Sequence, residues 1–485
     1  MKKKNKKHDA NLSMIIDEEI KHNSLRQGFP RSLGTYLKKI EGKKITNHKD
    51  LTNIPFVTID GEDSKDFDDA VWSKHENNET KIMVAISDVS FFITKNDPLD
   101  LEAKKRGNSF YFPDRVIPMF PEEISNNICS LVPHKKRACL VIEIKIKDLK
   151  IKSFDIHRAK IISVARLSYN QVDEIYFNKL RTNEHFLLIN NLFKSYEILK
   201  KISELRNKIN FSTDEFQIIQ ELNNDFFFKK KKKLISYKLI EEFMVLANET
   251  VAKYLKINNL NSIFRNHERP KDEKIKELTK LLKENALYNN ERFKNQKDFN
   301  KVLERLRKKK TFLNDALLRA QAKAYYGEIN LGHFGLGLDY YTHFTSPIRR
   351  YSDLNVHRDL VDFFFNKKRN NIESSLSKHL TFQEKMSDSI ERNIIEKACS
   401  LYIRNKKKKY FTGIIDGIES FGIFIKAIEL PFSCLVRTKY RFIKNSQNQK
   451  KIEVVYKIGQ KVSFKIKKNN VKSGKILGEK MKIII

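Results

Sequence analysis

The segment TIDGEDSKDFDDAV, residues 58–71, constrains the fold more than any other part of the chain. Six carboxylates lie within ten consecutive positions of it: Asp60, Glu62, Asp63, Asp66, Asp68 and Asp69. Carboxylates this close repel one another, so a folded chain must expose them to water or bring them a counter-cation. The segment follows a strand-like run, and residues 66 and 68 would project to one side of an extended strand. A turn at Gly61 would bring Asp60 back toward them, so that three or four carboxylates converge on one point.

Converging carboxylates favour a hard cation, magnesium or manganese, that is held partly by protein oxygens and partly by substrate phosphate and water. A calcium loop of the EF-hand type does not fit. Its pattern needs glycine at the sixth position and a carboxylate at the twelfth, where this chain has Lys65 and Val71. An acidic turn in water that binds no metal is an open alternative at this point.

The charge of the whole chain points to a polyanionic partner. The chain carries 95 Lys and Arg against 60 Asp and Glu, a formal net charge of +35, and such a field attracts nucleic acid. Part of the excess has a compositional origin, because Lys, Asn and Ile are all abundant, as in proteins encoded by AT-rich genomes. An acidic cluster in a basic chain suits phosphodiester chemistry, in which metal ions activate water and basic groups hold phosphates.

The changes in composition and hydrophobic pattern along the 485-residue chain predict three parts. Residues 1–50 form a polar, basic arm or linker with one short helix around MIIDEEI. Residues 51–403 form a mixed α/β domain, which begins with strand-like runs and continues with helical periodicity, as in LIEEFMVLANETVAKYL. Residues 408–485 contain four short predicted strands, FTGIIDG, FGIFIKAI, SCLV and QKVSFKIKK, which suggest a small all-β barrel of the OB type.

Several classes of protein are disfavoured. The four cysteines show no C-x-x-C pair and no Cys/His spacing that suits a zinc site. No apolar run approaches the length of a membrane span, and the start MKKKNKKHDA leads into polar sequence instead of a signal core. The sequence therefore predicts a cytoplasmic protein that does not associate with membranes, and we expect a monomer.

A second group of polar residues lies in HFTSPIRRYSDLNVHR, residues 343–358. Ser-Pro predicts a turn, after which Arg349 or Arg350 could reach a phosphate with two parallel hydrogen bonds. Arginine pairs are also common in surface ion pairs, so the motif alone leaves both interpretations open. The lysine runs at residues 226–233 and 305–310 are typical of solvated surface, and a phosphate-tracking surface is the alternative.

The motifs TIDGEDSKDFDDAV, VAISDVSFFI, GNSFYFPDRVIPMFPEEISNNICSL, FRNHERP and HFTSPIRRYSDLNVHR, in that order, resemble the ribonuclease II and ribonuclease R (RNB) family, and most of all its ribonuclease R branch. The chain after residue 408 resembles the S1-type OB-fold domain that follows in the family. The resemblance implies an α/β catalytic RNB domain and an S1-type RNA-binding barrel. It also implies a magnesium-dependent 3′-to-5′ exoribonuclease that starts at single-stranded 3′ ends and releases nucleoside 5′-monophosphates.

The resemblance also implies roles for particular residues. The four acidic positions of the family motif correspond to Asp60, Asp66, Asp68 and Asp69, of which Asp68 matches the residue most directly tied to catalysis. Asp60 and Asp69 are the expected direct metal ligands, and Arg349 is expected to contact the phosphate near the cut. The expected RNA-binding residues are Tyr111, which would stack on a terminal base, Glu241 near the terminal nucleotide, Arg350, Phe421 and Phe424. The adjacent Glu242 is an alternative to Glu241, and a core aromatic is the alternative for Tyr111.

The chain departs from the family pattern in two ways. It reaches the catalytic motif by residue 58, which leaves no room before it for the cold-shock domains of longer members. Arg437 stands where the S1 domain usually has histidine. The first departure predicts a weaker hold on RNA, for which the basicity of the rest of the chain could compensate. A non-catalytic S1-type RNA-binding protein and a metal-dependent DNA nuclease are the rival functions that the sequence leaves open.

Overall fold

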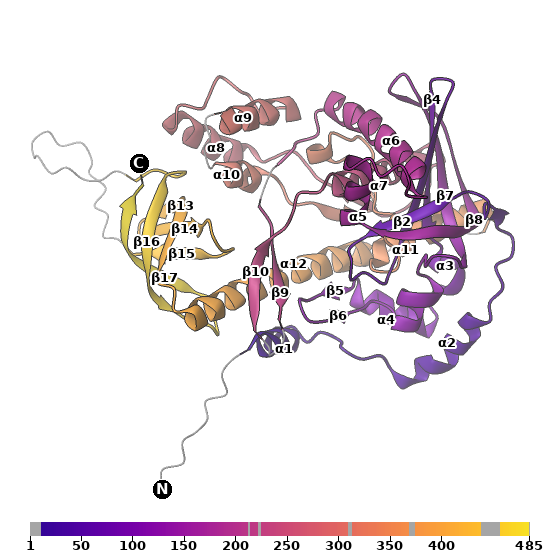
Figure 1. Cartoon of the computed structure of the whole chain (residues 1–485), viewed down its shortest axis with the longest axis horizontal. Coiled ribbons are helices and arrows are strands. Elements are labelled where there is room, and N and C mark those ends of the chain that lie inside the picture. Colours follow the sequence, from indigo (N-terminus) through magenta and orange to yellow (C-terminus); the bar gives the residue numbers. More distant parts are fainter. Residues whose placement is uncertain are drawn as a thin grey trace, which may run out of the picture.

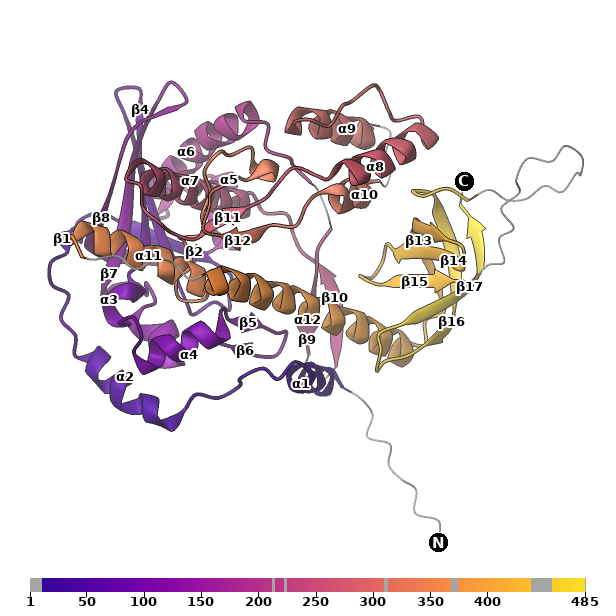
Figure 2. The ribbon, with the colours of Figure 1, turned by 180° about the vertical axis from the view of Figure 1, so that it is seen from behind.

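The computed structural model describes residues 11–211, 214–221, 225–308, 313–367, 374–437 and 456–484. A large mixed α/β unit and a small β-barrel lie at opposite ends of the molecule (Figure 1). The long helix α12, Ser374–Lys406, runs between them, as the view from behind makes plain (Figure 2). The predicted fold class, a mixed α/β domain followed by a small all-β domain, is confirmed.

The large unit is built on a six-stranded sheet with the strand order β1-β8-β2-β3-β4-β7. Strand β8 pairs with β2 in parallel orientation and with β7, at the far end of the strand order, in antiparallel orientation. This long strand therefore joins the two ends of the sheet, which curls. The strands span Lys49–Asp50 (β1), Phe56–Asp60 (β2), Asp69–Glu76 (β3), Glu79–Ser87 (β4), Lys136–Lys147 (β7) and Lys150–Ser168 (β8).

Four helices pack against this sheet and share one buried apolar cluster with it: α5 (Tyr169–Phe177), α6 (Phe186–Leu205), α7 (Ile235–Ile257) and α11 (Tyr351–Phe364). The helical period predicted for α7 is confirmed. Ile240, Phe243, Ala247 and Val251 are buried in that cluster, with Met244 partly buried beside them. The burial of these side chains fixes α7 on the sheet.

The N-terminal segment contains the predicted helix and a second one. Helix α1, Leu12–His22, includes MIIDEEI and buries Ile15, Ile16 and Ile20 against α12. Helix α2, Gly34–Glu41, follows a 3₁₀ turn at Arg31–Leu33 and shares an apolar cluster with α3 (Val89–Phe92) and α4 (Pro98–Arg106). The segment therefore contributes to the apolar core of the large unit.

Three groups of shorter elements complete the large unit. Around the sheet lie α3 (Val89–Phe92), α4 (Pro98–Arg106), β5 (Phe110–Tyr111), β6 (Val116–Ile117) and a π-helix (Glu123–Ile128). A hairpin of β9 (Phe216–Gln220) and β10 (Phe226–Lys230) stands between the large unit and the barrel (Figure 1). The others are β11 (Phe264–Asn266), α8 (Asp272–Glu284), α9 (Gln296–Lys308), α10 (Asn314–Ala320), β12 (Tyr325–Gly327) and a 3₁₀ turn (Phe334–Leu336).

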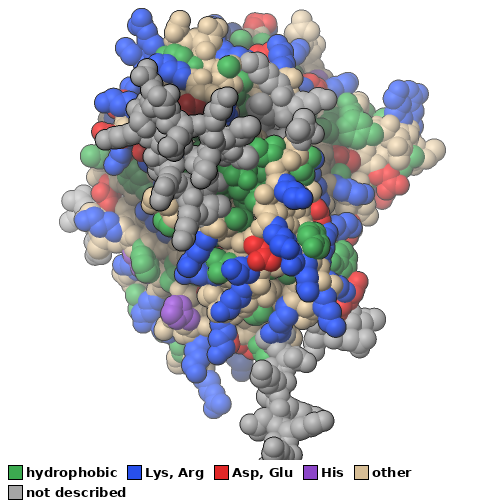
Figure 3. Space-filling view, turned by 90° about the vertical axis from the view of Figure 1, so that its left-hand side faces the viewer, with side chains coloured by type: hydrophobic (Ala, Val, Ile, Leu, Met, Phe, Trp, Pro, Cys, Tyr) green, Lys and Arg blue, Asp and Glu red, His purple; other side chains and the backbone are tan. Residues whose placement is uncertain are grey.

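The C-terminal unit is a closed five-stranded barrel with the order β13-β14-β15-β17-β16. Its strands span Tyr410–Glu419 (β13), Gly422–Ala427 (β14), Ser433–Val436 (β15), Lys461–Asn469 (β16) and Ile476–Ile483 (β17). The four predicted strands are confirmed, and β17 was not predicted. Arg319 of α10 forms an ion pair with Asp416 at 2.6 Å and so connects the barrel to the large unit. Lys and Arg side chains are scattered over the barrel end of the molecule (Figure 3).

Among the described residues, no helix combines the length and the apolar character that crossing a membrane requires.

Candidate active site

The acidic loop, residues 60–69, connects two neighbouring strands of the central sheet. Asp60 is the last residue of β2 and Asp69 is the first residue of β3. The two strands are antiparallel, with Val57 opposite Val71, so the two aspartates lie at the same edge of the sheet. The expectation of an extended strand through residues 66 and 68 is wrong, because residues 61–68 form an irregular loop. Tertiary contacts, and not strand alternation, decide where these two side chains point.

Hydrogen bonds from neighbouring segments hold the loop. The Ser130 hydroxyl donates to the carbonyl oxygen of Lys65 at 2.7 Å and accepts from the Phe67 N–H at 3.0 Å. The N–H of Ser87, at the end of β4, donates to the carbonyl oxygen of Asp68 at 2.8 Å. The backbone of the loop is thus fixed before any ligand arrives.

Asp68 is a buried carboxylate with incomplete compensation. Its side chain is 4% exposed, and its Oδ1 accepts a 2.8 Å hydrogen bond from the N–H of Ile348, in the distant SPIRR motif. Oδ2 lies 3.5 Å from Arg349 Nε and has no hydrogen-bond partner among the described residues. Burial raises the pKa of Asp68 well above its ordinary value, although Arg349 opposes the shift. A buried oxygen without a donor is where a cation would be most strongly bound.

Burial raises the pKa values of Asp60 and Asp69 as well. Burial raises the pKa of Asp69 to about 7, and the neighbouring charge of Asp60 adds to the shift. Burial also raises the pKa of Asp60, whose Oδ1 accepts hydrogen bonds from the Gly61 N–H and the Ser64 hydroxyl. These oxygen donors are the type that magnesium prefers. Within the described part of the chain, no group of three or more His, Cys, Asp or Glu side chains lies so that it could hold a metal ion, so water or phosphate would have to supply most of the ligands.

The two adjacent arginines have different environments. The predicted Ser-Pro turn is present, since the N–H groups of Arg349 and Arg350 both donate to the Ser346 carbonyl. The Arg349 side chain is 44% exposed and lies beside Asp68. The Arg350 guanidinium donates to both carboxylate oxygens of Asp353, at 2.7 and 2.9 Å. Arg349 is therefore available to a ligand, whereas Arg350 is already engaged, and its predicted contact with RNA stays a prediction.

Tyrosines flank the acidic loop on two sides. On one side, the Tyr111 hydroxyl of β5 donates to Asp66 Oδ2 at 2.6 Å, and the ring is 46% exposed. On the other, Tyr169 packs on Tyr237 with 4.1 Å between ring centroids. Burial and the charges of Asp69 and Asp60 raise the pKa of Tyr169. Sequence reasoning missed this tyrosine pair, because its members lie on α5 and α7, far apart in the chain.

Glu241 and Glu242 belong to a separate ion cluster. Lys208 Nζ donates to a carboxylate oxygen of each, at 2.5 and 2.9 Å, and Arg206 contacts Glu242 at 3.3 Å. Glu242 is buried, whereas the Glu241 side chain is 53% exposed. No described hydrogen bond or ion pair joins either glutamate to the acidic loop, so the role expected of Glu241 stays a prediction.

In the predicted aromatic pair of the barrel, Phe421 is exposed and Phe424 is half-buried. Phe421 is 56% exposed, and its ring lies edge-on to Phe424 with 6.0 Å between centroids. Arg437, at the end of β15, is exposed as well. Such an arrangement suits stacking on unpaired bases.

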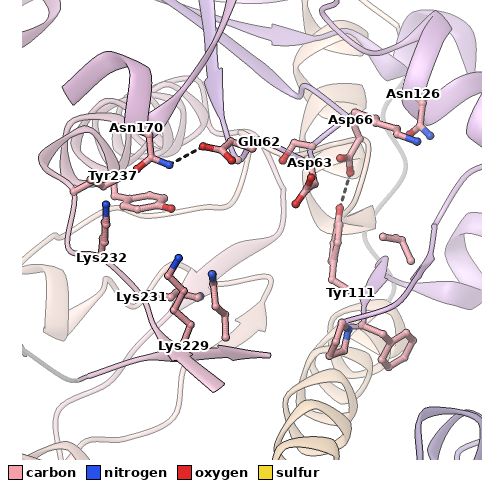
Figure 4. A pocket seen from close by; sticks show the side chains of 18 of the residues that line it. Glu62, Asp63, Asp66, Tyr111, Asn126, Asn170, Lys229, Lys231, Lys232 and Tyr237 are labelled. Carbon is pink, nitrogen blue, oxygen red and sulfur yellow. Dashed lines mark hydrogen bonds between the residues drawn. The ribbon is translucent and has the colours of Figure 1, made fainter. Parts of the chain in front are cut away.

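A cleft of about 1080 Å³ opens beside the acidic loop. Glu62, Asp63, Asp66 and Tyr111 line one wall, and lysines at the end of β10 line the facing wall (Figure 4). Asp66 belongs both to this cleft and to the predicted catalytic carboxylates. The cleft is therefore contiguous with the candidate active site.

Comparison with known proteins agrees with this geometry. Residues 48–366 match the family described as the RNB domain. The chain belongs to the RNB-domain family. Its curated relatives include ribonuclease R of Escherichia coli (strain K12), 32% identical over 460 residues, and ribonuclease R of Thermotoga maritima, 32% identical over 469 residues. The family resemblance inferred from the motifs is thereby confirmed.

Solved structures give the same result. Mycoplasma genitalium RNase R in complex with ribose-methylated single-stranded RNA is 28% identical and superimposes with a TM-score of 0.90, covering 96% of this chain and 78% of that one. The matches to the curated relatives cover 88% and 91% of this chain. The chain spans only 56% of the length of the Escherichia coli protein and 65% of the Thermotoga maritima protein.

Proposed function

We propose that this chain is a 3′-to-5′ exoribonuclease that hydrolyses single-stranded RNA and releases nucleoside 5′-monophosphates with the help of a divalent metal ion. The observation that carries the proposal is Asp68. It is a buried carboxylate with an unpartnered oxygen, beside the half-exposed guanidinium of Arg349. A folded chain tolerates such a charge where a bound cation compensates it. Family membership adds the class of reaction.

Magnesium is the metal we favour, with manganese as the alternative, because all the candidate donors are carboxylate oxygens. Asp60, Asp66, Asp68 and Asp69 would hold it. When bound, the metal would activate water and neutralise the leaving oxygen. Arg349, whose half-exposed guanidinium donates to the Ser346 hydroxyl at 3.0 Å, would bind the phosphate at the cut through its remaining N–H groups. Asp66 would also orient Tyr111 for stacking, through the hydrogen bond between them.

We assign RNA contacts outside the acidic loop on the same basis. Phe421 and Phe424 would stack on unpaired bases, while scattered Lys and Arg hold the backbone without regard to sequence. Glu241 would lie near the terminal nucleotide, and Arg350 would act through its neighbour Arg349. The solved complexes of Mycoplasma genitalium RNase R with single-stranded and with double-stranded RNA support an RNA substrate.

Two rival functions make different predictions. A non-catalytic RNA-binding protein has no use for a loop with four aspartates between two central strands or for the raised pKa of Asp69. A DNA nuclease would use the same acids and arginine, and it differs only in the sugar that it accepts. Recognition of the 2′-hydroxyl would separate RNA from DNA.

A single assay tests the proposal. Purified protein is incubated with 5′-labelled single-stranded RNA, with magnesium or with chelator, and the products are resolved by size. We expect magnesium-dependent collapse of the label to a very short product and little action on the matched DNA strand. RNA that is bound but stays intact would support the non-catalytic rival, and equal rates on RNA and DNA would refute the preference for RNA.

A further inference from the structure

The cleft beside the acidic loop has walls of opposite charge. Glu62 and Asp63 are exposed on the wall formed by the acidic loop. The other wall comes from the end of β10 and the turn into α7, where Lys229, Lys231 and Lys232 project into the cleft (Figure 4). A ligand that fits both walls must carry negative charge at one end and hydrogen-bond donors at the other.

The lysines of this wall fall into two kinds. Lys230 pairs with Asp214 at 2.6 Å and Lys231 pairs with Glu215 at 3.0 Å. Lys229 and Lys232 line the same cleft, and no carboxylate of the described residues lies within ion-pair distance of them. Their ammonium groups are therefore the ones free to bind an anion.

An aromatic surface lies between the two walls. Tyr237 lines the cleft and is 45% exposed, and Tyr169 supports its inner face. Asn170 donates a 2.8 Å hydrogen bond to Glu62 and so fixes the carboxylate that faces the cleft (Figure 4). Stacking on such a ring does not discriminate between bases, because every base presents a π face.

We propose that this cleft is a subsite for the nucleoside 5′-monophosphate that the proposed exoribonuclease releases. Lys229 and Lys232 bind the 5′-phosphate, and the base stacks on Tyr237. The 2′- and 3′-hydroxyls of the ribose donate to Glu62 and Asp63, as carboxylates accept ribose hydroxyls at other nucleotide sites. The inference rests on the proposed function, which supplies this product.

The acidic wall favours a nucleotide with a free 3′-hydroxyl, as in the released monophosphate or at the 3′ end of the RNA, over a nucleotide inside the RNA chain. In RNA, a phosphate follows each ribose on its 3′ side, and here it would meet the carboxylates of Glu62 and Asp63. The released nucleotide has a free 3′-hydroxyl at that position and avoids the repulsion. Asp66 lines this cleft and accepts the hydrogen bond from Tyr111, so the product would leave the active site along a continuous surface.

Equilibrium dialysis of labelled adenosine 5′-monophosphate, in chelator and without RNA, tests the proposal. We expect saturable binding to the wild-type protein. Adenosine, which lacks the phosphate, and 2′,3′-dideoxyadenosine 5′-monophosphate, which lacks the hydroxyls, should each bind about tenfold more weakly or worse. No binding of the monophosphate, or equal binding of the dideoxy form, would overturn the assignment.

Two double variants with the same change of charge localise the site. Lys229→Gln with Lys232→Gln should raise the dissociation constant about tenfold. Lys274→Gln with Lys308→Gln removes two lysines outside the cleft, which pair with Glu277 and Glu304, and should change it less than about threefold. Equal losses in both would mean diffuse attraction and would overturn the inference. Thermal melting of each variant confirms that it is folded.

Two further measurements separate the possible failures. A single-stranded RNA lacking a 5′-phosphate is added as a competitor. If it displaces the nucleotide with the same sensitivity to Lys229→Gln/Lys232→Gln, the cleft holds the chain and not the product, and the inference is wrong. Cleavage of RNA with magnesium is assayed on the same preparation. Intact RNA there refutes the proposed function, whereas the dialysis still decides whether the cleft binds a nucleotide.

Discussion

The acidic loop and the start of α11 each bury an aspartate beside an arginine, and they do so in opposite ways. Asp353 accepts two hydrogen bonds from Arg350, one from the Ser346 N–H and one from the Ser352 hydroxyl. Asp68 accepts one, from Ile348, and its second oxygen has no hydrogen-bond partner among the described side chains and backbone groups. Both carboxylate oxygens of Asp353 thus have hydrogen-bond partners, whereas only one oxygen of Asp68 has a partner among the described residues.

The difference separates a structural ion pair from a ligand site. Removing one partner of a buried, fully hydrogen-bonded ion pair destabilises the fold, because the other partner is left buried and unpaired. A buried charge with an open coordination position costs stability until something binds. Two adjacent arginines thus acquire different tasks: Arg350 fixes the turn, and Arg349 faces the place where a phosphate would lie.

Asp68→Asn should have the largest effect on activity and almost none on folding. The amide oxygen can still accept the hydrogen bond from Ile348, while the charge that would hold the metal is gone. We expect cleavage of labelled RNA to fall about 10³-fold or more, with RNA affinity changed less than about threefold because Lys and Arg elsewhere carry the attraction.

The free energy of unfolding of the same variant sharpens the comparison. Since burial raises the pKa of Asp68, the ionised carboxylate is unfavourable in the metal-free fold, and its removal should leave stability unchanged or increased at neutral pH. A clear loss of stability in urea titrations without metal would mean that Asp68 is compensated like Asp353. Retained cleavage would refute its catalytic role.

Arg350→Met should have the opposite profile. It leaves Asp353 buried without its main partner, so we expect the free energy of unfolding to fall by about 3 kcal/mol. Urea denaturation followed by circular dichroism measures this. Cleavage per folded molecule should fall no further than in Arg349→Gln, because Arg350 acts only through its neighbour, and RNA affinity per folded molecule should not change. A stable variant with weakened RNA binding would instead place Arg350 in the RNA contact.

Arg349→Gln tests the other arginine of the pair. The side chain is 44% exposed and its ion pair with Asp68 is long, so we expect stability to change by less than about 0.5 kcal/mol. Single-turnover cleavage should slow about 10²-fold, because a donor aimed at the charge that develops on the phosphate is lost. Arg349→Lys keeps the charge without the planar fork and should recover only part of the rate. Full recovery would show that charge alone is needed.

How much of this was predictable differs between the fold and the site. The two-part architecture, the period of α7 and four of the five barrel strands follow from local patterns that the packing preserves. The convergence of the aspartates on one metal stays a prediction, and the geometry of their loop could not be predicted, because the loop is shaped by Ser130, Ser87 and Ile348 from distant segments. The different environments of Arg349 and Arg350 are invisible in the sequence for the same reason.

The smallest predicted effect concerns pH and Asp69. Its pKa is about 7 in the metal-free fold, against about 3.9 for an unperturbed aspartate. The folded chain therefore holds an extra proton between these values, and the stability of the metal-free protein should fall as pH rises through this window, by at most about 1.4 kcal/mol per pH unit.

A bound cation must displace the proton, so magnesium should raise the melting temperature more at about pH 8 than at about pH 6. Asp69→Asn should remove the share of this pH dependence that Asp69 contributes and leave that of Asp359, whose pKa burial also raises to about 7, while Asp353, whose partner is already present, offers magnesium no site. If magnesium raised the melting temperature equally at all pH values, the cation would bind away from Asp69. The acidic loop would then differ from Asp353 in its hydrogen bonds but not in its ability to bind a cation.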